Sequence, residues 1–255
     1  MIEVRNLHKG FNGVQVLKGI NADFEPGKTS LIIGQSGSGK TVFLKSLIGL
    51  HTPEEGAISY DGKLNVDFTL DEKRLWRQEI GMVFQGSALF DSQTVEENVM
   101  FPLKMFTKKP EDEMRDRVNV VLQRVDLENS NKKFPAELSG GMQKRVAIAR
   151  AIVMNPKYLF CDEPNSGLDP NTAILIDNLV QEITHEYKIT TVINTHDMNS
   201  VMEIGEKIVF LKEGVKAWEG TKDDIFKTDN ESVVKFVYSS KLFKKVREAY
   251  LNETK

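Results

Sequence analysis

One glycine-rich stretch constrains the fold of this chain more than any other: Gly34-Gln35-Ser36-Gly37-Ser38-Gly39-Lys40-Thr41. It fits the pattern Gly-x-x-x-x-Gly-Lys-[Ser/Thr], a loop that binds phosphate groups between a buried strand and a helix. The apolar run Leu31-Ile32-Ile33 precedes the loop, and apolar residues at helical spacing follow it. This order of strand, loop and helix favours a phosphate-binding loop over a Gly/Ser loop that binds nothing.

The residue types in this loop suit a nucleoside triphosphate. Gly34, Gly37 and Gly39 lack Cβ, so backbone N–H groups can approach phosphate oxygens closely. The following helix carries roughly half a positive charge at its N-terminus, directed at the same phosphates. Lys40 is placed to reach the β- and γ-phosphates, and the Thr41 hydroxyl to bind Mg²⁺. All eight residues are therefore candidate nucleotide-binding residues.

Composition and charge narrow the class of protein. The 255 residues suffice for one or two domains, and a net charge of −3 gives no indication of nucleic-acid binding. Cys161 is the only cysteine, which excludes an internal disulfide framework. The chain shows no signal peptide and no apolar run of the roughly 18–20 residues that a membrane span needs. We therefore expect a soluble polypeptide that attaches to a membrane only through a partner.

The order of the predicted elements indicates an α/β fold. Short strands are expected near 2–4, 14–16, 20–24 and 31–33, and later ones near 81–84, 158–161, 190–194 and 207–211. Helices dominate between about 92 and 155. The pattern predicts a P-loop NTPase with a mostly parallel sheet, an N-terminal antiparallel β subdomain and an inserted α-helical subdomain. We expect the main domain at 1–225, with its helical subdomain at about 92–155, and a helical extension at 226–255.

Polar residues follow three predicted strands at the edge where open α/β sheets bind ligands. Asp162 would hold Mg²⁺, directly or through water, and Glu163 would polarise the attacking water. An acidic pair can also merely solvate a strand end, but the phosphate loop favours the catalytic interpretation. His196 could bond to the γ-phosphate. Gln85 could contact Mg²⁺ or the attacking water.

A second helix start, Leu138-Ser139-Gly140-Gly141-Met142, has the features of another anion site. One nucleotide does not need two such sites from a single chain. We therefore predict a head-to-tail dimer in which Ser139, Gly140 and Gly141 reach the γ-phosphate bound by the partner copy. Asp169, followed by Pro170, suits the N-cap of the next helix, a role compatible with nucleotide binding.

One aromatic residue, Phe11, lies between two predicted strands and is flanked by Gly10 and Asn12-Gly13. A ring held on a hairpin turn could stack on adenine. The spacing alone leaves an ordinary packing role equally open.

Together these residues resemble the ATP-binding subunits of ABC transporters, over about residues 2–225. The matching motifs are Walker A (34–41), the Q-loop (84–85), the signature motif (138–142), Walker B (158–163), the D-loop (166–169) and the switch histidine (196). The resemblance implies ATP and Mg²⁺ as cofactors, catalysis by Lys40, Gln85, Glu163 and His196, and adenine stacking by Phe11. Met142 departs from the usual glutamine of the family.

Within this family the chain looks most similar to the Mla/Mce-type lipid-transport ATPases. The features that carry this similarity are the run 84–90, the pattern Val95-x-x-Asn98-Val99-x-Phe101-Pro102-Leu103, and Met142 in the signature. The similarity implies peripheral attachment to the cytoplasmic face of a bacterial inner membrane. It also implies permease subunits, whose intracellular helix would insert near Gln85–Phe90, and an Mce-domain lipid-binding protein.

Alternative functions remain open from the sequence. The chain could energise an importer of another solute such as an amino acid, or act as an ATP switch in DNA repair or on ribosomes. The last is disfavoured, because the chain has neither a long coiled-coil insertion nor a second nucleotide domain. A helix is predicted at the C-terminus, with Leu242, Phe243, Val246 and Tyr250 on one face, packed either on its own domain or on a neighbouring copy.

Overall fold

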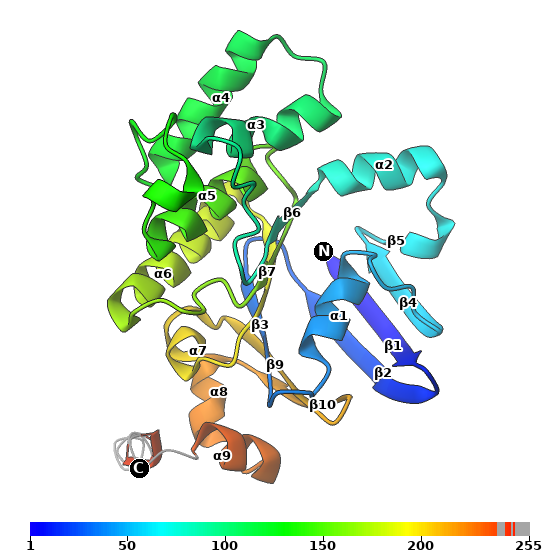
Figure 1. Ribbon diagram of the computed structural model, residues 1–255. Helices are drawn as coiled ribbons and strands as arrows, with labels where there is room; N and C mark the ends of the chain where they lie inside the picture. Colours follow the sequence, from blue (N-terminus) through cyan, green and yellow to red (C-terminus); the bar gives the residue numbers. More distant parts are fainter. Residues whose placement is uncertain (239–242, 246, 248–255) are drawn as a thin grey trace. The chain divides into compact units, whose positions relative to one another are not determined.

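The computed structural model describes residues 1–238, 243–245 and 247. The chain divides into two compact units. The first comprises Met1–Asp67 and Val192–Lys255, and the second comprises Phe68–Thr191. Figure 1 labels the elements of both units.

The first unit contains an antiparallel sheet with strand order β2-β1-β4-β5. Its strands are β1 (Ile2–Phe11), β2 (Val14–Phe24), β4 (Glu55–Tyr60) and β5 (Lys63–Leu64). β1 and β2 are longer than predicted, because they form one hairpin whose turn, Asn12-Gly13, has positive φ at both residues. Burial alternates along the end of β2, since Ile20, Ala22 and Phe24 are buried. The N-terminal antiparallel subdomain is therefore present (Figure 1).

The first unit also contains the strand that leads into the phosphate loop. This strand, β3 (Thr29–Ile33), is buried at all five positions and pairs in parallel with β9 (Lys207–Lys212). β10 (Val215–Gly220) pairs with β9 in antiparallel orientation after a turn at Glu213-Gly214, where both residues have positive φ. α1 (Lys40–Leu47) follows the phosphate loop.

The first unit also contains three short helices, α7 (Met198–Ile204), α8 (Lys222–Lys227) and α9 (Glu231–Val237). α7 and α8 are not among the predicted elements, whereas α9 lies within the helical extension expected at 226–255. Each is six or seven residues long, so it completes too few turns to show a clear helical period. Their starts are capped by the side chains of Asp197, Thr221 and Asn230.

The second unit combines two parallel strands with a group of helices. β6 (Ile80–Val83) pairs in parallel with β7 (Tyr158–Asp162). The helices are α2 (Leu70–Gln78), α3 (Val95–Phe106), α4 (Glu111–Arg124), α5 (Gly140–Ile152) and α6 (Pro170–Tyr187). Contacts of α3 with α4 and of both with α5 confirm the predicted helical region (Figure 1). Short 3-10 turns lie at Asn65–Asp67, in the first unit, and at Pro135–Glu137.

β8 (Thr190–Asn194) crosses the boundary between the units. On the first unit's side, the N–H of Thr195 donates to the carbonyl of Ile32 at 3.2 Å. On the second unit's side, the N–H of Thr190 donates to the carbonyl of Lys157 at 2.9 Å.

Side-chain caps fix several helix starts. Thr94 and Glu97 form a capping box at the start of α3, with the N–H of Thr94 donating to the Glu97 carboxylate at 2.8 Å. Asp169 caps α6, with Pro170 at the first helical position, as predicted.

The predicted C-terminal helix falls largely on residues 239–242, 246 and 248–255, which lie outside the described residues. Arg247, which is described, donates to the carbonyls of Phe226 and Thr228, at 3.2 and 2.7 Å. This side chain therefore contacts its own chain.

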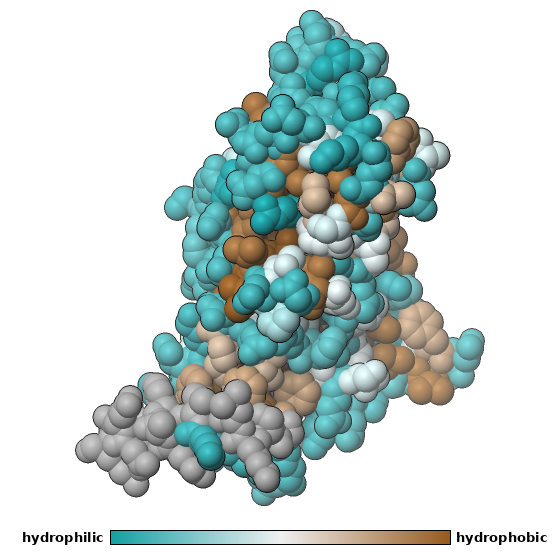
Figure 2. Space-filling view, turned by 60° about the vertical axis from the view of Figure 1, so that its left-hand side comes forward, coloured by the Kyte–Doolittle hydropathy of each residue, from teal (hydrophilic) through white to brown (hydrophobic). Residues whose placement is uncertain are grey.

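Within the described ranges, no helix has both the length and the apolar composition needed to cross a bilayer. The face drawn in Figure 2 is mostly hydrophilic, with hydrophobic side chains gathered in separate patches.

Candidate nucleotide-binding and catalytic site

The phosphate loop of the first unit curves around its own lysine. The Lys40 ammonium donates to the carbonyls of Gly34, at 2.9 Å, and Gln35, at 3.1 Å. The N–H of Ser38 donates to the Gln35 carbonyl at 3.1 Å. These bonds direct the loop carbonyls toward the lysine.

Two glycines of this loop are required by close packing. A Cβ on Gly34 would lie 2.3 Å from the Leu211 carbonyl oxygen, and the φ of Gly34, 151°, suits glycine alone. A Cβ on Gly39 would lie 2.9 Å from the Leu17 side chain. Gly37 differs, because a Cβ there would meet nothing within 4 Å.

The start of α1 is suited to an anion. Its N-cap, Gly39, offers no side-chain hydrogen bond, and its first turn contains no acidic residue. The first N–H groups and the positive end of the helix dipole are therefore not satisfied by a side-chain cap. The buried Ser38 hydroxyl also lacks a hydrogen-bond partner. These features fit a bound phosphate chain.

Two other predicted residues of the first unit are exposed. His196 follows β8, and the bond from its neighbour Thr195 to Ile32 sets this segment beside the end of β3. Phe11 is 39% exposed at the hairpin turn, and its ring meets the His51 ring edge-on, with centroids 5.1 Å apart. Burial and the charges of Lys45 and Lys9 lower the pKa of His51, so this ring is neutral near pH 7.

The second unit brings Gln85 and Glu163 together at the ends of β6 and β7. Val83 and Cys161 are paired in register, so both strands deliver their next residues to one edge. The Gln85 amide donates to the Glu163 carboxylate at 3.0 Å and to the Ser166 hydroxyl at 3.3 Å. Glu163 has a φ of 48°, an uncommon conformation for a non-glycine residue that is frequent at functional sites.

Asp162 and Cys161 differ in exposure. The Asp162 side chain, at the end of β7, is half-buried, as a carboxylate available to a cation would be. Cys161 is fully buried, and burial raises the pKa of its thiol, so this side chain has a packing role rather than a reactive one. Within the described ranges, no cluster of three or more His, Cys, Asp or Glu residues could hold a metal ion.

Lys144 is a residue of this site that sequence reasoning missed. It lies on α5, is buried, and donates a hydrogen bond from its ammonium to the Gln85 carbonyl. Burial lowers its pKa, an effect that the charge of Glu163 opposes. The sequence offered one signal for it, a lysine shortly before the apolar run of residues 146–149 in a predicted helix.

The signature loop forms the start of α5. The N–H of Met142 donates to the Ser139 hydroxyl oxygen at 3.3 Å, and the serine remains exposed. Its hydroxyl hydrogen is still available to donate to a phosphate. A Cβ on Gly141 would lie 2.6 Å from the Thr172 methyl, while Gly140 meets only Leu168, at 3.4 Å.

Asp169 uses its carboxylate to cap α6. It accepts from the N–H groups of Asn171 and Thr172, both at 3.1 Å. Hydrogen bonds from Thr172 lower the pKa of Asp169.

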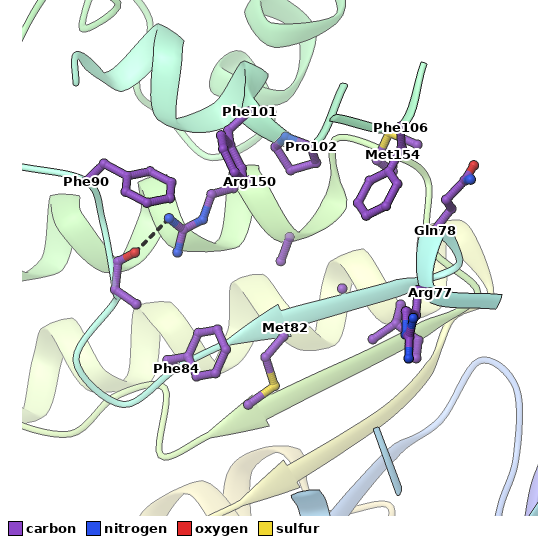
Figure 3. Close-up of a pocket in the computed structure, with 14 residues that line it drawn as sticks. Arg77, Gln78, Met82, Phe84, Phe90, Phe101, Pro102, Phe106, Arg150 and Met154 are labelled. Carbon is purple, nitrogen blue, oxygen red and sulfur yellow. Dashed lines mark hydrogen bonds between the residues drawn. The ribbon is translucent and has the colours of Figure 1, made fainter. Parts of the chain in front are cut away.

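A pocket of about 280 Å³ lies in the second unit next to the loop that follows β6. Figure 3 shows Phe90, Phe101 and Pro102 on one side, Met82 and Phe84 on the other, and Arg150 between them. Of the segment Gln85–Phe90, where a permease helix is expected to insert, Ala88 and Phe90 line the pocket and Leu89 does not. The pocket walls are therefore largely aromatic and apolar, with Arg77 and Arg150 as cations.

The fold and the glycine-rich loop define a nucleoside triphosphatase of the phosphate-loop class. The family model described as ABC transporter matches residues 17–166. A probable ribonucleotide transport ATP-binding protein, mkl, of Mycobacterium leprae is 39% identical over 92% of this chain and 68% of its own length. A methionine import ATP-binding protein, MetN, of Clostridium tetani is 40% identical over 91% of this chain and 73% of its own length.

Two solved structures have the same fold. A dimeric, post-hydrolysis structure of the ATP-binding cassette MJ0796, bound to ADP and Pi, aligns with a TM-score of 0.79 and 34% identity. It covers 87% of this chain and 99% of the other. The structure of cbiO1 from Clostridium perfringens, part of the ABC transporter complex cbiONQ, aligns with a TM-score of 0.83 and 33% identity over 98% of each chain.

The chain therefore belongs to the ABC transporter family, as an ATP-binding cassette that hydrolyses ATP with Mg²⁺.

Proposed function

We propose that two copies of this chain clasp two ATP·Mg²⁺ head to tail, and that hydrolysis opens them to drive a transporter. The observation that carries this proposal is the second anion site, the exposed Ser139 hydroxyl at the glycine-rich start of α5. The relative MJ0796 is dimeric with ADP and Pi bound, which supports the same arrangement here.

The proposed roles follow from the chemistry of each side chain. The loop amides, Lys40 and Mg²⁺ neutralise charge that develops on the phosphates. Glu163 polarises the attacking water, which Gln85 and His196 position. Thr41, Asp162 and Gln85 are the proposed Mg²⁺ ligands, and Phe11 stacks on adenine. Asp169 holds the start of α6 beside the signature loop.

The transporter partner is proposed to dock in the pocket beside residues 84–90. Its aromatic walls and two arginines suit an intracellular permease helix that presents an apolar side chain next to an acidic one. The relative cbiO1 is part of a transporter complex, which supports permease subunits as the occupants. The cassette would then be held peripherally at the cytoplasmic face of the inner membrane.

For the transported substrate, we favour import of a small polar solute. The relatives are named for methionine import and ribonucleotide transport. Lipid transport with an Mce-domain partner is the second candidate, supported by the run 84–90 and by Met142 in the signature. Purification of the native complex, with mass spectrometry of co-purified lipids and uptake assays with labelled methionine, would separate the two candidates.

The test of the ATPase mechanism is Glu163→Gln. We expect ATP binding to be retained, turnover to fall by at least about 100-fold, and an ATP-bound dimer to accumulate. Turnover and the dimer fraction are measured by phosphate release and size-exclusion chromatography with light scattering. The control is Glu128→Gln, an exposed glutamate of the same unit. Wild-type turnover in Glu163→Gln, or the absence of an ATP-dependent dimer, would contradict the proposal.

A further inference from the structure

Two basic side chains of α5 hold the same loop. Lys144 donates to the Gln85 carbonyl, and Arg150 donates to the carbonyls of Ser87, at 2.7 Å, and Ala88, at 2.8 Å. The two basic residues are six positions apart, which corresponds to about 9 Å along the helix axis. Residues 85–88 are therefore attached to α5 at both ends of the segment. Figure 3 shows the bond from Arg150 to Ala88 at the edge of the pocket.

The attached loop has a demanding backbone conformation. Ser87 and Ala88 have φ values of 62° and 48°, so two successive non-glycine residues are left-handed. This conformation is strained for a residue that carries a Cβ. The hydrogen bonds from Arg150 stabilise this turn, so they favour a single conformation of the loop.

The same loop holds the proposed catalytic carboxylate. The Gln85 backbone accepts the bond from Lys144, while its side chain donates to Glu163 and Ser166. Gln85 thus links Lys144 to Glu163 through two hydrogen bonds. Ser139 is the N-cap of α5 and lies five residues before Lys144.

We propose that Lys144 is a positioning residue that couples the Ser139 end of α5 to the Gln85–Glu163 pair. The inference rests on the head-to-tail pair proposed above. In that pair Ser139 contacts the nucleotide of the partner copy, whereas Glu163 acts on the nucleotide of its own chain. A helix moves as a rigid element, so a shift at Ser139 also moves Lys144 and the Gln85 carbonyl. Occupancy of one nucleotide site therefore sets the position of Glu163 in the other.

The chain offers matched variants for a test. Lys144→Met keeps a long unbranched side chain and removes the ammonium donor. Lys144→Arg restores a cationic donor. Arg145→Met is the control, because Arg145 is the next residue on α5 but donates to the Val125 carbonyl, at 3.2 Å, and to Asp126, at 3.1 Å.

The experiment measures ATP hydrolysis against ATP concentration in the assembled transporter, where the permease holds both copies together. For Lys144→Met we expect kcat to fall about tenfold while KM stays within about twofold. We expect the wild-type Hill coefficient to exceed 1, with two as its limit for two sites, and to fall toward 1 in this variant. Lys144→Arg should recover most of both quantities, and Arg145→Met should match the wild type.

Three outcomes would overturn the inference. They are a wild-type Hill coefficient of 1, a Lys144→Met enzyme with unchanged kcat, and an Arg145→Met enzyme with the same losses. A second measurement separates coupling between the two nucleotide sites from closure of the dimer. Lys144→Met in the Glu163→Gln background should still form the ATP-dependent dimer. Loss of that dimer would assign Lys144 to dimer closure instead of coupling. Failure of the proposed function is distinguishable, because the wild type itself would then lack ATP hydrolysis or the dimer.

Discussion

At the scale of single residues, the phosphate loop depends on where a Cβ atom fits. Gly34 and Gly37 both have positive φ, 151° and 79°, but their surroundings differ. A methyl group on Gly34 would collide with the Leu211 carbonyl and the Ser38 hydroxyl, whereas one on Gly37 would enter open space. Backbone strain is thus common to both positions, and steric exclusion is special to Gly34.

This difference predicts unequal effects of alanine in one loop. Gly34→Ala should lower the free energy of unfolding by about 3 kcal/mol or more and abolish ATP binding, because the loop must move away from β9. Gly37→Ala should cost only about 1–2 kcal/mol, the strain of left-handed alanine. Urea unfolding and fluorescent-nucleotide titration measure both effects. Equal destabilisation by the two variants would contradict the steric argument.

At the scale of elements, one side chain of α3 determines how the pocket loop is held. Asn98 is fully buried, and its carbonyl accepts from the N–H of Phe90 at 2.8 Å. Its amide group donates to the carbonyls of Phe90, Gln93 and Thr94, at 3.0–3.1 Å. The amide thereby ties residues 90–94 to the helix that they precede.

Asn98→Ala should therefore destabilise the second unit. Because it leaves several buried backbone groups without partners, we expect a loss of about 3 kcal/mol in the free energy of unfolding. Lys104→Ala, at an exposed position on the same helix, should change stability by less than about 0.5 kcal/mol. Chemical denaturation provides the measurement, and a loss below about 1 kcal/mol for Asn98→Ala would refute the assigned role.

A second prediction at this scale concerns pH. The Glu96 carboxylate on α3 is buried, which opposes ionisation, but hydrogen bonds from Asn131 and Arg115 and the charge of Lys132 lower its pKa below the ordinary 4.5. A carboxylate with a lower pKa in the folded chain stabilises the fold above its unfolded pKa. This contribution disappears as pH falls through the folded value.

Glu96→Gln should cost about 1 kcal/mol at pH 7, a modest figure because Arg115 and Lys132 are largely exposed and water screens them. The difference between wild type and variant should shrink progressively below about pH 4.5. Denaturant unfolding between pH 3 and 7 tests this. A difference that stays constant over that range would assign the effect to packing rather than to charge.

At the scale of the whole molecule, the proposed function depends on which residues each of two copies contributes to a nucleotide site. If each site combines Lys40 and Glu163 of one chain with Ser139 of the other, different inactive variants can complement one another. A mixed pair of Lys40→Ala and Ser139→Arg has both defects in one site and none in the other.

We therefore expect activity to reappear when these two inactive variants are mixed. Its ceiling is about a quarter of the wild-type rate, because half of the random pairs are mixed and each has one intact site of two. A mixture of Lys40→Ala with Glu163→Gln is the control, since every site then carries one defect and should stay inactive. Phosphate release measures both mixtures. Activity in the control mixture as well would reverse the assignment of Glu163 to its own chain's nucleotide.

Much of the fold follows from short-range patterns. The buried strand β3 and the Asp169 cap of α6 were predicted because each depends on residues within a few positions of one another. The helices α7 and α8 were missed because they are too short to show a period. The candidate site divides in the same way: its motif residues were predicted, while Lys144, Arg150 and the contacts of Asn98 were not.

The sequence by itself determined which chemistry is present, because glycines, a lysine and a threonine at the spacing of residues 34–41 specify phosphate binding wherever the loop lies. It also indicated which polar residues follow a strand and which begin a helix. Only the tertiary structure decided which side chains meet. Lys144 reaches the Gln85 carbonyl across 59 positions, and Arg150 reaches Ser87 across 63. Such bonds depend on how α5 packs beside β6, and no local pattern of residues encodes that packing.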